Sequence, residues 1–176
     1  MSRPRKAKTL TVLNGELVVL RRATEADLPR LLEIMGAPEV ARRWGVYDRE
    51  RLRSEILGSQ EVALAIEVEG TTVGLIQYGE ELEPDYRHAS IDIFIDPDWH
   101  GQGLGTDAVR TLARYLVDDR GHHRLIIDPA ADNAAAIACY KKVGFKPVGI
   151  MRNYERGPDG AWHDSLLMDL LAEEVG

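Results

Sequence analysis

The chain has 176 residues, a net charge of −7, and apolar and charged shares of 44% and 29%, which are ordinary for one soluble globular domain with its own core. No apolar run approaches the roughly 20 residues that would span a membrane. The negative charge argues against nucleic acid, which requires a basic face; it permits a cationic substrate but equally serves solubility alone.

The amino terminus and the cysteine content set further expectations. The first eight residues are basic and no long apolar segment follows them, so we expect no secretory signal. Residues 1–14 are predicted to form a flexible tail, and residues 15–176 a single domain. Cys139 is the only cysteine, which excludes an internal disulfide and favours a reducing, cytoplasmic location.

The first half of the chain predicts a mixture of strands and amphipathic helices. Apolar and alternating runs indicate strands, whereas apolar residues at helical spacing after the capping residue Thr24 indicate a helix. Gly70 and Thr71 mark the turn of a hairpin. The predicted elements, in order, are a strand at 16–22, helices at 24–35, 38–44 and 48–57, and strands at 61–69 and 72–80.

An acidic segment that contains a proline, residues 80–85, follows this hairpin. It is either a solvated surface loop or an electrostatic rim, with Glu83 and Asp85, for an amine-rich substrate. The sequence leaves both interpretations open.

The next strand, residues 88–96, alternates cleanly between two faces. Ile91, Ile93 and Ile95 share one face. Asp92 lies on the other face, beside Phe94. A carboxylate in mid-strand is either paired as a structural group or lines a cavity.

The segment 101–106 reads Gly-Gln-Gly-Leu-Gly-Thr and lies between this strand and an amphipathic helix. Glycines let a backbone approach a ligand closely, and the start of a helix presents unpaired N–H groups and the positive end of its dipole. This is the build of a pyrophosphate site. The third glycine comes one residue too early for a dinucleotide-binding fingerprint, and Thr106 stands where a P-loop has Lys.

The second half of the chain continues the mixed order. The predicted elements are a helix at 104–119, a strand at 123–128, a helix at 133–143, and strands at 145–155 and 161–171 that flank a turn at 157–160. Antiparallel hairpins at both ends exclude a plain doubly wound sheet and favour the α+β class.

Two stretches resemble the GNAT (GCN5-related N-acetyltransferase) superfamily. His100, Gly103 and Gly105 fill the slots of its motif A, Q/R-x-x-G-x-G/A, with His100 where the family usually has Arg or Gln. The family's N-x-x-A-x-x-x-Y-x-x-x-G-F signature matches at Asn133, Ala136, Tyr140, Gly144 and Phe145. The resemblance implies the GNAT fold: a mixed central sheet whose fourth and fifth strands splay apart, helices on both faces, and a C-terminal β-hairpin.

The resemblance also implies acetyl-CoA as the cosubstrate and no metal. In this family the glycine segment holds the pyrophosphate, the end of the fourth strand pairs with the pantetheine arm, and an Asn side chain touches the CoA arm. The matching cofactor-binding residues are Phe94, Ile95, His100, Gly101, Gln102, Gly103, Leu104, Gly105, Thr106 and Asn133.

Acetyl transfer to a primary amine requires a base, because an amine with a pKa near 10.4 is only about one part in 2,500 neutral at pH 7. Asp92 and Asp128 are the candidates, since parallel neighbouring strands would bring their C-terminal halves together. Each has a structural alternative, as a paired or turn-forming group. Tyr140 stands at the family's general-acid position for the departing thiolate, or is a core aromatic. Cys139 has no base beside it in the sequence and is interpreted as a small buried hydrophobe.

Within the superfamily, Asp128–Pro129, Cys139–Tyr140 and the segment 20–44 resemble aminoglycoside 6'-N-acetyltransferases. The resemblance implies an antibiotic-resistance enzyme that acetylates the 6'-amine, with the region between the first two strands lining the acceptor pocket. Trp44 is alternatively a core anchor. The candidate substrate-binding residues are Trp44, Tyr47, Glu83, Asp85, Asp128 and Asp159.

Other acceptors stay open, because the early segment also resembles protein N-terminal acetyltransferases and siderophore lysine N-acyltransferases. A domain that only senses acyl-CoA is the non-enzymatic alternative, and the presence of both Asp92 and Tyr140 speaks against it. We expect a cationic small-molecule amine as partner, and neither nucleic acid nor membrane. By the same resemblance, a homodimer can form through pairing of the final hairpins.

Overall fold

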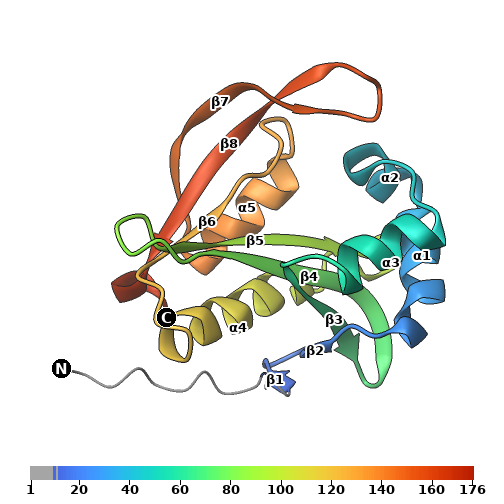
Figure 1. The fold of residues 1–176 in the computed structure, drawn as a ribbon, viewed down its shortest axis with the longest axis horizontal. Helices are drawn as coiled ribbons and strands as arrows, with labels where there is room; N and C mark the ends of the chain where they lie inside the picture. The colour runs from blue at the N-terminus through green and yellow to red at the C-terminus, as the bar shows by residue number, and fades with distance from the viewer. Residues whose placement is uncertain (1–9, 11) are drawn as a thin grey trace.

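The structure, a computed structural model, describes residue 10 and residues 12–176, which form one eight-stranded sheet (Figure 1). The strand order is β1-β2-β3-β4-β5-β6-β8-β7, with β5 and β6 parallel and all other neighbours antiparallel. The strands are β1 Val12–Asn14, β2 Val19–Arg22, β3 Val62–Val68, β4 Thr71–Glu81, β5 His88–Ile95, β6 Arg124–Ile127, β7 Lys146–Arg156 and β8 Trp162–Leu171.

Helices cover both faces of this sheet. One core cluster joins α1, α2 and α3 to one face, and a larger cluster joins α4 and α5 to the other. Together with the terminal hairpin β7–β8, this confirms the predicted α+β, GNAT-like architecture. The helices are α1 Leu28–Met35, α2 Pro38–Trp44, α3 Arg49–Leu57, α4 Leu104–Asp118 and α5 Ala134–Val143.

The two faces of β5 follow the predicted alternation. Ile91 and Ile95 are buried in the cluster around α4, whereas Phe94 is buried in the cluster around α1. Asp92 therefore points to the face that α1, α2 and α3 cover, and it lies opposite Gln77 of β4.

The strands β5 and β6 separate soon after they begin. Their parallel ladder consists of Ala89 with Leu125 and Ser90 with Ile126. From Ile91 to Ile95 the edge of β5 that faces β6 carries no ladder, which confirms the splayed strands predicted from the resemblance. A gap of this kind leaves backbone N–H and C=O groups free for a ligand.

The amino-terminal boundary differs from the prediction. Residues 12–14, placed in the flexible tail by the sequence, form β1 and pair with β2. Leu10, in the same predicted tail, is buried in the core cluster around α4, and residues 1–9 and 11 lie outside the described residues. The strand predicted at 16–22 begins only at Val19, because residues 15–18 form the turn that joins β1 to β2.

The carboxylate of Asp107 holds this turn against the start of α4. It accepts hydrogen bonds from the backbone N–H groups of Glu16, Leu17 and Val18, at 3.1, 2.7 and 3.0 Å. Asp107 is only 5% exposed, so the three bonds satisfy a buried charge. The turn thus fixes the helix that carries the glycine segment.

The terminal hairpin is long and irregular. β7 is exposed along nearly all of its length and forms one edge of the sheet. Between Met151 and Glu155 the register with β8 shifts, and Asn153 in this bulge has φ +47°. The carboxylate of Asp164 accepts the backbone N–H of Asn153 at 2.8 Å and holds the bulge in place. Within the described residues, no helix has both the length and the apolar character needed to cross a membrane.

Candidate active site

The glycine segment forms a turn that leads into α4. Gly101 and Gly103 have φ values of +76° and +79°, in the region that other residues rarely adopt. Gly103 is the N-cap of α4, and the first intrahelical bond runs from the N–H of Asp107 to its carbonyl. The N–H groups of the first helical residues, Leu104 to Thr106, therefore have no partner within the helix and can bind an anion.

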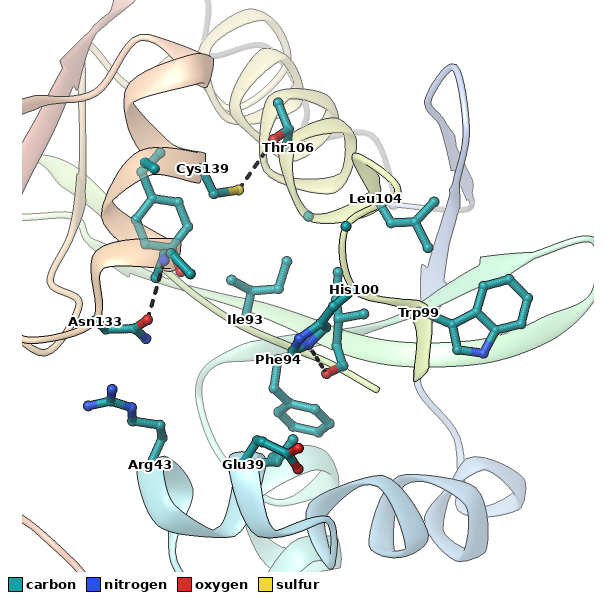
Figure 2. Close-up of a pocket in the computed structure, with 18 of the residues that line it drawn as sticks. Glu39, Arg43, Ile93, Phe94, Trp99, His100, Leu104, Thr106, Asn133 and Cys139 are labelled. Atoms are coloured by element: carbon teal, nitrogen blue, oxygen red, sulfur yellow. Dashed lines mark hydrogen bonds between the residues drawn. The ribbon is translucent and has the colours of Figure 1, made fainter. Parts of the chain in front are cut away.

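A cavity of about 610 Å³ lies over this turn and along the free edge of β5 (Figure 2). Its wall combines the end of β5, the glycine segment, the first turns of α5 and one side of α2. Arg42, Arg43 and Lys142 bring positive charge to it. Of the predicted cofactor-binding residues, the cavity is lined by Phe94, Ile95, His100, Gly101, Gly103, Leu104, Gly105, Thr106 and Asn133, and not by Gln102.

His100 contacts the backbone of the same strand. Its Nε2 lies 2.8 Å from the carbonyl oxygen of Ile95, as the dashed line in Figure 2 shows. The imidazole thus joins the glycine turn to the end of β5. Gln102 is exposed on the turn and does not line the cavity. Neither His100 nor Gln102 therefore takes the place of the Arg or Gln side chain that the family usually has at the start of motif A. The backbone N–H groups of the turn remain the anion-binding element.

Asn133 both caps α5 and lines the cavity. Asn133 is the N-cap of α5, and its Oδ1 accepts the N–H of Ala136 at 3.3 Å. Its amide N–H₂ remains available toward the cavity (Figure 2). The preceding residue, Asp132, pairs with Arg43 of α2 at 2.6 Å.

Asp92 lies just beyond the Tyr140 end of the cavity. Desolvation by the surrounding protein and the nearby charge of Asp128 raise the pKa of its carboxyl, to about 7. The N–H of Ile93 donates to Oδ1 at 3.2 Å and opposes the shift. Solvent still reaches the Asp92 side chain, which limits the part of this rise that comes from desolvation.

Asp128 follows β6, on the far side of the gap. Partial burial raises its pKa, and an interaction with the hydroxyl of Tyr154 opposes that rise. A hydrogen bond fixes the loop after Asp128 to β8: the backbone N–H of Leu166 donates to the carbonyl oxygen of Pro129 at 2.9 Å. Asp92 and Asp128 thus lie near each other on opposite sides of the gap, as the strand order predicted.

Tyr140 completes this group. Its ring is buried and packs edge-on against Phe145, with 6.3 Å between ring centroids. Burial and the charges of Asp92 and Asp128 raise the pKa of its hydroxyl, so Tyr140 stays protonated and can act only as a donor.

Cys139 also lines the cavity, beside Thr106 of α4 at 3.3 Å (Figure 2). Burial raises the pKa of its thiol, which lowers the fraction of reactive thiolate. This agrees with its interpretation as a small hydrophobe.

Two predicted acceptor residues lie near the same centre. Trp44 lines the cavity and meets Phe94 edge-on at 5.1 Å, so it belongs to both the wall and the core. The Tyr47 hydroxyl donates to Glu55 at 2.7 Å, and the Arg51 guanidinium stacks on its ring. Asp92 contributes to the raised pKa of Tyr47, which places Tyr47 near that acid.

The structure does not bring Glu83 and Asp85 to the cavity. They are exposed in the loop before β5, at the end of that strand opposite Ile95 (Figure 1). Glu80, at the start of the acidic segment, pairs with Arg120 and His122 and is structural. Asp159 lies in the β7–β8 turn, beside His163, and lines a second cavity.

Three residues near the site were missed from the sequence: Tyr154, Glu155 and Arg43. Tyr154 lies in the irregular stretch of β7 and interacts with Asp128, and Glu155 raises the pKa of Asp92. No local pattern reveals a bulge or a contact between distant segments.

Comparisons with known proteins agree with this geometry. The family model described as "Acetyltransferase (GNAT) domain" matches residues 18–146. An aminoglycoside N(6')-acetyltransferase type 1 of Klebsiella pneumoniae is 29% identical over 168 residues, which cover 84% of this chain and 81% of that protein. The [ribosomal protein bS18]-alanine N-acetyltransferase of Escherichia coli K12 is 42% identical over 82 residues, about half of either protein at 45% and 52%.

Solved structures show the same fold. A GNAT-family acetyltransferase from Bacillus anthracis superposes with a TM-score of 0.81 at 18% identity, covering 93% of this chain and all of that one. RimL, a ribosomal L7/L12 alpha-N-protein acetyltransferase in complex with coenzyme A, gives 0.80 at 20% identity and covers 91% and 97%. With a family model that matches most of its length, the chain belongs to the GNAT family of acetyltransferases.

Proposed function

We propose that this protein transfers an acetyl group from acetyl-CoA directly to a primary amine, and that the leading acceptor is the 6'-amine of an aminoglycoside antibiotic. The observation that carries the proposal is the pair of carboxyl groups, Asp92 and Asp128, with raised pKa values beside the Tyr140 end of a cavity suited to CoA.

The cavity suits the donor in shape and charge. The N–H groups at the start of α4 and the left-handed glycines Gly101 and Gly103 favour a pyrophosphate, and Arg42 and Lys142 favour its negative charge. The free edge of β5 offers backbone groups to the amides of pantetheine. GNAT acetyltransferases use acetyl-CoA, which supplies an activated acetyl thioester.

Asp92 is the proposed base. A carboxylate whose pKa is raised toward neutral pH is a better proton acceptor than an ordinary Asp. Asp128 keeps that pKa high and, when ionised, attracts the ammonium form of the acceptor. Because the two groups interact, their protons are lost in coupled steps.

Tyr140 is the proposed donor to the leaving thiolate. Its raised pKa makes full proton transfer uphill, so a hydrogen bond from the hydroxyl is the main contribution. Direct transfer also agrees with the raised pKa of Cys139, which disfavours an acetylated cysteine.

The aminoglycoside acceptor is supported by charge and by likeness. Asp92, Asp128, Glu61 and Glu155 give the centre a negative field that suits a polycation. The aminoglycoside-modifying relative matches over most of its length. A cytoplasmic location and a homodimer through pairing of the final hairpins stay predictions.

The α-amine of a protein N-terminus is the second candidate. It is favoured by the 42% identity to the ribosomal protein alanine acetyltransferase. A peptide acceptor needs the same base and donor, so the catalytic group alone does not distinguish the two.

The deciding experiment measures thiol release from acetyl-CoA with kanamycin, tobramycin, gentamicin, an Ala-initiated peptide and N6-hydroxylysine as acceptors. We expect rapid release with kanamycin and tobramycin and an N-acetyl product at the 6'-amine. Release only with the peptide or with hydroxylysine would replace the proposed acceptor. CoA binding without turnover on any amine would identify a sensor domain.

A further inference from the structure

A second cavity, of about 620 Å³, lies between α2 and the terminal hairpin. Its walls are the side of α2, the loop at residues 130–132, and the facing arms of β7 and β8 around their turn. Arg42 and Arg43 line both cavities, so this space continues the first one past α2. Neither the donor site nor the proposed base accounts for it.

Negative side chains predominate on the walls of this second cavity. It is lined by Asp132, Glu155, Asp159 and Asp164 against two guanidinium groups. Three of the four carboxylates have partners: Asp132 has Arg43, Asp159 has His163, and Asp164 has the N–H of Asn153.

The fourth carboxylate, that of Glu155, makes no hydrogen bond or ion pair with any side chain in the described part of the protein. The Glu155 side chain is exposed to the cavity, and its negative charge contributes to the raised pKa of Asp92. Glu155 is thus an unneutralised acid between the second cavity and the catalytic carboxyl pair.

An aromatic wall accompanies this charge. Trp162, at the start of β8, lines the cavity and is 59% exposed, so its indole is accessible to a ligand there. An exposed indole face beside a carboxylate suits an organic cation, which gains from both cation–π attraction and charge pairing.

The hairpin turn that carries these groups is well defined. The N–H of Gly157 donates to the carbonyl of Ala161 at 2.8 Å, and the N–H of Ala161 donates to Asp159 at 3.0 Å. A side chain at Gly157 would meet the His163 ring at 2.7 Å, so the ring packs directly on the turn. The wall is therefore built before any ligand arrives.

We propose that the second cavity binds a distal ammonium group of a small polyamine acceptor, with Glu155 and Trp162 as its recognition residues, while the reacting amine lies at Asp92. This rests on the proposed function and narrows it to acceptors that carry at least two cationic groups. Aminoglycosides meet this requirement, and a neutral peptide with a single α-amine does not.

The test compares two acceptors that present the same primary amine: kanamycin A, a polycation, and 6-amino-6-deoxyglucose, a monoamine. Steady-state kinetics use the full chain, the variants Glu155→Gln and Trp162→Leu, and the matched control Glu173→Gln, which removes an exposed charge near the carboxyl terminus. We expect Glu155→Gln to raise the KM for kanamycin about fivefold and to leave the KM for the monoamine unchanged, while any change in kcat through the pKa of Asp92 should be the same for both acceptors. Trp162→Leu should do the same, and the control should change neither.

Equal changes in KM for both acceptors would overturn the proposal, because Glu155 would then not recognise a second cationic group. No change in KM, or faster turnover of a neutral peptide than of kanamycin, would also overturn it.

A binding measurement separates this inference from the proposed function. Calorimetric titration of the CoA complex with kanamycin should show binding that Glu155→Gln weakens. Such binding without acetylation would refute the proposed function alone, whereas acetylation without an effect of Glu155→Gln would refute this inference alone.

Discussion

Asp128, after the end of β6, raises the pKa of Asp92, in the middle of β5, although the two strands pair at only two positions. The gap between the strands lets the two carboxyl groups face each other across the site instead of being hidden within a continuous sheet. Like charges at close range cannot both ionise easily, so one of them retains its proton near neutral pH.

The first prediction concerns pH. In a plot of kcat/KM against pH, activity should rise along an acidic limb with a midpoint near 7, because Asp92 loses its proton there. Asp128→Asn removes a neighbouring negative charge, so the ionised form of Asp92 becomes easier to reach and the limb should move to lower pH. The measurement is kcat/KM from pH 5 to 9, with Asp118→Asn, an exposed site on α4, as control. A limb that stays in place would show that the two acids do not interact.

The second prediction concerns the base itself. Asp92→Asn should lower kcat/KM by about 100- to 10,000-fold, the usual contribution of a general base. Calorimetry should show unchanged CoA affinity, because Asp92 does not line the first cavity. Full activity in this variant would transfer the role of base to Asp128.

The third prediction uses two glycines with similar backbones. Gly103 and Gly121 have φ values of +79° and +74°, so replacement by Glu strains either position by about 1–2 kcal/mol. Only Gly103 lines the cavity. Gly103→Glu should weaken CoA binding at least about tenfold by placing a carboxylate beside the pyrophosphate. Gly121→Glu should bind CoA normally, and a matching loss in both variants would mean that strain alone is responsible.

The fourth prediction concerns the turn that Asp107 holds. Asp107→Asn should lower the free energy of unfolding by about 2–3 kcal/mol, because an amide cannot accept all three backbone N–H groups and presents donors to some of them. Chemical denaturation should show almost no loss for Asp118→Asn, on the last turn of the same helix. Similar losses for both would mean that the three bonds contribute little.

The fifth prediction concerns His122, which is 1% exposed and whose Nδ1 has no partner among the described residues. Burial lowers its pKa, and the hydrogen bond to Glu80 opposes this. A depressed pKa means that folding favours the neutral ring, so this contribution to stability is complete above pH 6.5 and is lost as pH falls below it. Between pH 7 and 5, His122→Gln should show a shallower fall in the free energy of unfolding than the unmodified chain. The exposed His123→Gln should keep the original slope; if both variants share one slope, His122 does not titrate in this range.

Much of this fold could be predicted because its signals are local. The helix at Pro38–Trp44 was placed to the residue, and the alternation of β5 assigned Asp92 to the correct face, since side-chain period and capping depend on neighbours in sequence. The glycine turn was predicted for the same reason.

What the sequence could not supply depends on contacts between distant segments. The Asp107 bonds span about 90 positions, and Arg43 reaches Asp132 across 89. The acidic loop at residues 80–85 shows a case in which a local signal pointed to the wrong place. Its composition suggested a substrate rim, but strand direction carries Glu83 to the end of β5 away from the cavity, and composition says nothing about direction.

Cys139 gives the protein a natural single-site reporter. It is the only thiol in the chain, and its sulfur lies on the wall of the cavity that we assign to CoA. A thiol-directed dye would label one known position without any engineering. The rate of labelling would then measure occupancy by the donor, in the same protein in which acceptor selectivity is studied.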